Sequence, residues 1–120
     1  MTVMKSPSCG CCGKWVEHVR AHGFDVKVVN VDDLMAVKKK AGIPDKLASC
    51  HTTIVGGYVV EGHVPAADIR KLLVQKPKAK GIAVPGMPAG SPGMEAGGFK
   101  QPYQTLLIKA DGSTSVFARH

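Results

Sequence analysis

Three cysteines stand together near the start of the chain, in the run Ser8-Cys9-Gly10-Cys11-Cys12-Gly13. A short apolar segment, Thr2-Val3-Met4, precedes this run, and a helical pattern that begins near Lys14 follows it. The cysteines are therefore predicted to lie on a turn between a strand and a helix. Backbone N–H groups without helical partners and the positive end of the helix dipole favour thiolate at such a turn, and the thiolate attacks disulfides and binds metals.

The fourth cysteine, Cys50, lies far from the others in the sequence, at the start of a predicted strand. Disulfides that stabilise a small domain usually join cysteines that are spread along the chain, whereas three of these four are clustered. The clustering points instead to redox chemistry or to a metal. Cys9 and Cys12 have the C-x-x-C spacing of redox-active cysteine pairs, so both kinds of chemistry stay open.

The pattern of apolar residues predicts the order β-α-β-α-β-β-α. The expected elements are a strand at 2–5, a helix from 10 or 11 to 22, a strand at 24–31, a helix capped by Asp32 or Asp33, strands at 50–55 and 58–61, and a helix from Pro65 to Leu73. Trp15 is expected in the core beneath the cysteine turn. Residues 81–98, rich in glycine and proline, are expected to form a long irregular loop, followed by a hairpin at 104–118.

The composition fits one domain that spans residues 1–120, with 44% apolar residues and no stretch long enough to cross a membrane. The net charge is +7, and the lysine runs Lys38-Lys39-Lys40 and Lys76 to Lys80 are expected to be solvated surface. No aromatic–basic interleaving accompanies this charge, so no nucleic-acid partner is expected. No secretory signal precedes the cysteines, which indicates either a cytosolic protein or a mature form.

With its C-x-x-C pair and this order of elements, the chain resembles the thioredoxin fold, an α/β domain with a central mixed sheet flanked by helices. In that fold, the loop that enters the third core strand packs against the C-x-x-C turn. The resemblance therefore implies that Cys50 comes close to Cys9, Cys11 and Cys12, so that the four cysteines form one site.

Four sulfurs suit Zn²⁺, an iron–sulfur cluster or Cu⁺. A structural zinc site prefers spaced pairs of ligands, whereas Cys9, Cys11 and Cys12 are crowded together. Crowded thiolates suit ions that share bridging sulfurs, and Cu⁺ accepts two or three soft ligands. Met87 and Met94 are further soft donors on the glycine-rich loop. We therefore expect copper(I), with several ions per chain, and place zinc second.

Longer motifs carry a more specific resemblance. They are Lys5 to Cys12, Ser49 to Thr52, Gly56 to Pro65, Val84 to Pro88 and Gly90 to Glu95. In this order, and over nearly the whole chain, they resemble the CopG-type copper-resistance proteins. The resemblance implies a periplasmic setting and a multinuclear copper(I) site in copper resistance or homeostasis, with Cu⁺/Cu²⁺ interconversion. It carries the ligand role onto Cys9, Cys11, Cys12 and Cys50, and implies copper ions and other copper-handling proteins as partners.

The histidines have weaker assignments. His51 follows Cys50 directly, and we expect it to orient a sulfur in preference to binding the metal itself. Met87 and Met94 are expected either to bind copper or to pack the loop against the core. His63 is expected to cap a helix or to lie on the surface. His18 and His22 share a helix face, but no third ligand accompanies them, so no metal site is predicted there.

Two alternatives remain at this stage. The first is an enzyme, a thiol–disulfide oxidoreductase with Cys9 as nucleophile and Cys12 as resolving thiol. Cys11 counts against it as a third, competing thiol, and so does Cys50-His51-Thr52 at the place where thioredoxin-like proteins usually carry a proline. The second is a domain stabilised by zinc, which would unfold when the metal is chelated.

Overall fold

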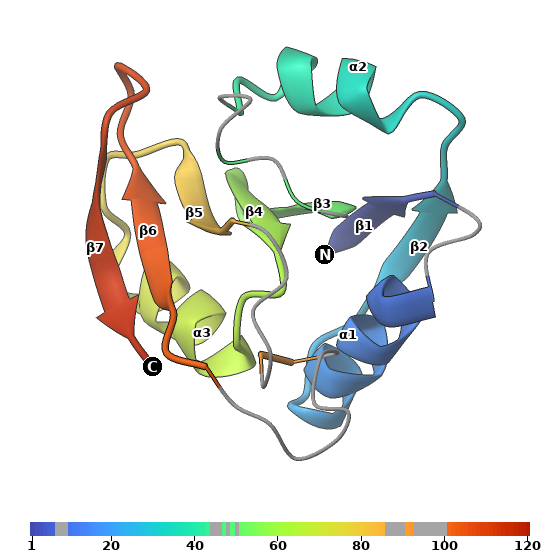
Figure 1. Ribbon diagram of the computed structural model, residues 1–120. Coiled ribbons are helices and arrows are strands. Elements are labelled where there is room, and N and C mark those ends of the chain that lie inside the picture. Colours follow the sequence, from blue (N-terminus) through green and yellow to red (C-terminus); the bar gives the residue numbers. More distant parts are fainter. Residues whose placement is uncertain (7–9, 44–46, 48, 50, 86–90, 93–100) are drawn as a thin grey trace.

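The computed structural model describes residues 1–6, 10–43, 47, 49, 51–85, 91–92 and 101–120 (Figure 1). The elements within these residues are β1 (Thr2–Lys5), α1 (Gly10–Ala21), β2 (Lys27–Asn30), α2 (Leu34–Lys40), β3 (His51–Val55), β4 (Tyr58–Gly62), α3 (Ala66–Gln75), β5 (Gly81–Val84), β6 (Gln104–Ile108) and β7 (Thr114–Arg119). The first seven elements follow the order β-α-β-α-β-β-α that the sequence predicts.

The strands form one mixed sheet in the order β2-β1-β3-β4-β5-β6-β7. β1 pairs parallel with β2 and antiparallel with β3, and β3 pairs antiparallel with β4. β5 joins parallel to β4, and β6 and β7 extend the sheet as an antiparallel hairpin. The first four strands with their three helices confirm the thioredoxin-like α/β fold, and the closing hairpin is also confirmed.

The helices cover both faces of the sheet, with α1 and α3 on one face and α2 on the other (Figure 1). The larger apolar core lies between the sheet and the helices α1 and α3. It includes Trp15 and Val19 of α1 and Ile69 and Leu72 of α3. A smaller core on the α2 face contains residues such as Ile43 and Val59. The central strands are therefore buried on both faces, which matters for the polar side chains they carry.

Trp15 anchors α1 to the rest of the fold. Its side chain is fully buried, and its indole Nε1 donates a hydrogen bond to the carbonyl oxygen of Val64 at 2.9 Å. A buried indole N–H needs such a partner, because leaving it unpaired would cost free energy. The expectation that Trp15 belongs to the core is confirmed, and the bond fixes α1 against the segment that follows β4.

The hairpin of β3 and β4 turns at Gly56 and Gly57, whose φ angles are +57° and +83°. Two successive residues with positive φ form the tight turn that suits antiparallel strands, and glycine adopts this conformation at little cost. The turn sets the register, which pairs Thr52 with Glu61. The same register brings His51, at the start of β3, beside the end of β4.

Two sequence-based predictions are wrong. Gly81–Val84 is not part of an irregular loop but the buried strand β5, which pairs with β4 and β6. Gly81 permits this pairing, since a Cβ there would lie 1.7 Å from the carbonyl oxygen of Val59. Lys38 is not on the solvated surface, because its side chain is buried on the inner side of α2. Residues 86–90 and 93–98 of the predicted loop lie outside the described residues.

Candidate metal centre

Cys12 is the predicted sulfur ligand whose side chain the structure describes. It lies in the first turn of α1, is fully buried and is disulfide-bonded. The side chains of Cys9, Cys11 and Cys50, like Met87 and Met94, lie outside the described residues. Within the described part of the chain, no three His, Cys, Asp or Glu side chains group together as a metal site would require.

His51 begins β3, and its side chain is completely buried. Its ring centroid lies 4.5 Å from that of Trp15, and the ring of His63 approaches edge-on at 5.0 Å. Burial, with smaller contributions from the charges of His63 and Lys38, lowers the pKa of His51 to about 3, although a hydrogen bond with the Gly62 backbone acts in the opposite direction. The imidazole is therefore neutral at pH 7, the form that can bind a metal.

His63 is buried as well, so the expectation that it caps a helix or lies on the surface is wrong. Its Nδ1 lies 2.6 Å from the carbonyl oxygen of Pro92, and burial lowers its pKa. Because a carbonyl oxygen only accepts, Nδ1 carries the proton, and Nε2 of the neutral ring carries the lone pair. The two buried histidines, which the β3–β4 register brings together, form a polar cluster inside the larger core.

Helix α1 connects this histidine cluster to Cys12. Cys12 and Trp15 are three positions apart on the helix, so their side chains share one face. Trp15 in turn contacts His51, which directly follows Cys50 in the sequence. The contact therefore brings His51 of β3 beside the α1 face that bears Cys12. The neutral imidazole of His51 is a ligand type that copper and zinc accept.

A second buried polar cluster lies on the opposite face of β3. Lys38 of α2 forms an ion pair with Glu61 of β4, and its Nζ also donates to Thr52 Oγ1 at 3.0 Å. Glu61 accepts from the Thr52 hydroxyl at 2.7 Å through Oε1 and from the Ser49 backbone N–H at 2.7 Å through Oε2. This cluster of four residues, which the sequence analysis did not find, is called the Lys38–Glu61 network below.

His18 and His22 lie side by side at the end of α1. The two ring centroids are 4.4 Å apart with the planes tilted by 44°, and His18 Nε2 accepts a hydrogen bond from the Ala66 backbone N–H at 3.2 Å. His22 Nδ1 lies 2.8 Å from the carbonyl oxygen of His18. Both side chains thus have hydrogen-bond partners within the fold.

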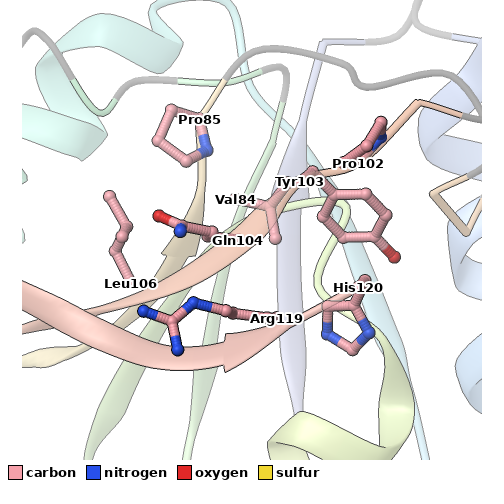
Figure 2. A pocket seen from close by; sticks show the side chains of 8 residues that line it. All are labelled: Val84, Pro85, Pro102, Tyr103, Gln104, Leu106, Arg119 and His120. Atoms are coloured by element: carbon pink, nitrogen blue, oxygen red, sulfur yellow. The ribbon is translucent and has the colours of Figure 1, made fainter.

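A pocket of about 530 Å³ opens at the C-terminal hairpin (Figure 2). Its lining residues are Val84, Pro85, Pro102, Tyr103, Gln104, Leu106, Arg119 and His120. Pro85 directly follows β5, and Pro102 lies two residues before β6. Tyr103 and His120 stack at 4.9 Å within it. No sequence pattern predicts this pocket, because its lining comes from strands that pair only in the folded chain.

Comparison with known proteins identifies the family. A family model described as "Protein of unknown function, DUF411" matches residues 47–94. Two solved structures, named "Copper resistance protein copG- Form 2" and "Copper resistance protein copG- Form 1", are each 45% identical to this chain, and both matches cover 99% of it. The matches cover 95% and 94% of those chains, with TM-scores of 0.95 and 0.94. The chain belongs to the CopG family of copper-resistance proteins.

No curated protein matches the chain. The similarity to CopG structures extends over nearly the whole length of both chains, so it includes the thioredoxin-like core and the β5–β7 extension. It supports a copper-related function for this CopG family member. Among the described residues, no helix combines the length and the apolar character that crossing a membrane would need.

Proposed function

We propose that this chain binds copper(I) through Cys9, Cys11, Cys12 and Cys50, in a cluster of several ions with shared sulfurs. The proposed role is copper resistance or homeostasis in the periplasm, and it includes Cu⁺/Cu²⁺ interconversion at the cluster. Several bound Cu⁺ ions would also neutralise the negative charge that four crowded thiolates would otherwise concentrate in one place.

The contact between Trp15 and His51 carries this proposal. It joins the helix face that bears Cys12 to the residue that follows Cys50, so it supports one shared site for both cysteine segments. The similarity to CopG copper-resistance proteins supports copper as the metal. Soft thiolate donors, with the neutral imidazole of His51 nearby, favour Cu⁺ over harder ions.

The test is an anaerobic titration of the fully reduced protein with Cu⁺, followed by ultraviolet absorption of the copper–thiolate bonds. We expect saturation above one equivalent, and a lower end point in each of the four single Cys→Ser variants. Saturation at one equivalent of Zn²⁺ with little uptake of Cu⁺ would contradict the proposal. Circular dichroism of each apo variant shows whether a lost site reflects lost folding.

Methionine and histidine ligands are tested in the same titration. Met87→Leu and Met94→Leu each remove a soft donor, and Met35→Leu is the matched control because Met35 lies exposed on α2. His51→Gln is compared with His22→Gln, since His22 is exposed in the turn that follows α1. A weaker affinity for Cu⁺ in Met87, Met94 or His51 variants, and not in the controls, would assign a role at the metal to that residue.

A thiol–disulfide oxidoreductase is the second candidate, because Cys12 takes part in a disulfide at the start of α1. Its position resembles that of redox-active cysteines at helix N-termini. A disulfide-reductase assay separates the two candidates. Turnover comparable to that of a thioredoxin, abolished by Cys9→Ser, would favour the oxidoreductase, whereas slow exchange together with uptake of several Cu⁺ ions would favour the copper site.

A further inference from the structure

The Lys38–Glu61 network is buried to an unusual degree for charged side chains. The side chains of Lys38 and Glu61 are 3% and 0% exposed. Charged residues are rarely buried without a partner, and a buried ion pair contributes little net stability because both charges lose their hydration. An apolar pair of similar volume would serve the core equally well. The network therefore calls for an explanation other than stability.

The contacts of Glu61 suggest what that explanation is. One carboxylate oxygen accepts from the Ser49 backbone N–H, and the other accepts from the Thr52 hydroxyl, each at 2.7 Å. Ser49 and Thr52 are the residues on either side of Cys50-His51. A single buried carboxylate thus holds both ends of the dipeptide that supplies a predicted sulfur ligand and the buried histidine.

The geometry of β3 strengthens the argument. Neighbouring side chains of a strand point to opposite faces of the sheet. Thr52 is held on the α2 face by Lys38 and Glu61, which directs His51 to the other face, where it contacts Trp15. Close packing adds to the restraint, since a Cβ at Gly62 would lie 2.7 Å from Ser49 Oγ. Ser49 and Thr52 therefore have little freedom to shift along the sheet.

We propose that Lys38 and Glu61 are positioning residues of the copper site, which hold Ser49 and Thr52, the residues on either side of Cys50 and His51. This inference rests on the proposed copper function. Lys38 forms an ion pair with Glu61 inside the core, and the Glu61 carboxylate accepts the hydrogen bonds from Ser49 and Thr52. Neither residue contacts the metal in this proposal.

Two double variants separate positioning from stability. In Lys38→Met/Glu61→Gln, the new amide can still accept from the Ser49 N–H and donate to Thr52. In Lys38→Met/Glu61→Leu, the core stays filled and uncharged but the segment loses its acceptor. Both avoid an unpaired buried charge, so both are expected to fold. We expect the Leu variant to bind Cu⁺ about 10- to 100-fold more weakly than the Gln variant, the range typical of lost outer-shell support.

The threonines of β3 provide a matched pair of single variants. Thr52→Val removes the hydroxyl that bonds Glu61, and Thr53→Val makes the same change one residue along. Thr53 is fully buried, and its Oγ1 has no hydrogen-bond partner among the residues that the structure describes. We expect Thr52→Val to weaken Cu⁺ binding, Thr52→Ser to restore it, and Thr53→Val to leave it unchanged.

Affinity is measured by competition with a chromophoric Cu⁺ chelator, and apo stability by urea denaturation in the same redox state. The copper–thiolate absorption spectrum adds a readout that stability alone would not change. Equal affinity and equal spectra in the Leu and Gln double variants would overturn the positioning role. Failure of the unsubstituted protein to bind Cu⁺ would instead refute the proposed function, so the two failures are distinguishable.

Discussion

Two buried carboxylates of this protein make similar contacts but connect different parts of the fold. Glu61 and Asp68 each accept a hydrogen bond from a threonine hydroxyl, at 2.7 Å from Thr52 and 2.6 Å from Thr105. Each also pairs with a basic side chain, Lys38 for Glu61 and His120 for Asp68. The two clusters differ in exposure and in the elements they connect.

The Lys38–Glu61 network is closed to solvent and joins α2, β3 and β4 inside the thioredoxin-like core, where it also binds a backbone N–H. The cluster around Asp68 is partly open, since the His120 side chain is 24% exposed, and it fastens α3 to the β6–β7 extension. The comparison teaches that burial decides the cost of losing a partner. In the closed network the remaining charge has no access to water, whereas in the open cluster it can be hydrated.

The largest expected effect follows from Lys38→Met, which leaves the Glu61 carboxylate buried without its cation. We expect the free energy of unfolding to fall by about 3–5 kcal/mol, the range for breaking a buried ion pair. Urea denaturation at pH 7 measures it, with Lys39→Met as control because Lys39 is exposed on the same helix. A loss below about 1 kcal/mol, as for a surface ion pair, would remove the distinction drawn between the two clusters.

A smaller effect is expected from Asp68→Ala, which leaves the Thr105 hydroxyl without its acceptor and removes the contact to His120. The free energy of unfolding should fall by about 1–3 kcal/mol, the cost of a buried polar group left unpaired. Copper uptake should stay at the level of the unsubstituted protein, because this cluster holds the extension. If a folded Asp68→Ala protein lost copper binding, the cluster around Asp68 would also be needed to support the metal site, which contradicts the comparison.

The smallest effect is expected at Asp111, a fully exposed carboxylate in the β6–β7 turn. The Ser113 hydroxyl and backbone N–H donate to it at 2.6 and 2.9 Å, and these bonds hold its pKa below the usual value. Its stabilising contribution is therefore complete above the ordinary pKa of aspartate and disappears as the pH falls through the lowered one. Melting temperatures of the unsubstituted and Asp111→Ala proteins should differ slightly at pH 7 and converge in acid. A difference that persists in acid would show that the turn depends on something other than this charge.

The order of elements could be predicted because apolar periodicity and turn residues agree along most of the chain. Trp15 falls on the apolar face of its helix, and Gly56-Gly57 marks the hairpin, so each local signal points to the same fold. The strand β5 was not predicted, because a glycine such as Gly81 is typical of loops. Its lack of a side chain is what lets β5 approach Val59, and that requirement exists only after the strands pair.

The polar residues inside the fold were harder to find. Lys38 belongs to a run of three lysines, a pattern typical of surface, and its burial depends on Glu61, which lies far away in the sequence. Two features of the sequence do indicate buried polar residues. Val59 and Val60 on both faces of one strand indicate that Glu61 beside them is buried too, and the hairpin register places His63 near His51.

The most direct test of the central claim is the ratio of copper to protein after anaerobic loading of the reduced chain with Cu⁺, beside its Cys50→Ser variant. Elemental analysis after removal of unbound metal gives the ratio for both. We predict several copper ions per chain in the unsubstituted protein and a sharp fall in Cys50→Ser, because the two cysteine segments share one cluster in the proposed site. An equal ratio in both proteins, or one zinc with little copper, would contradict the account.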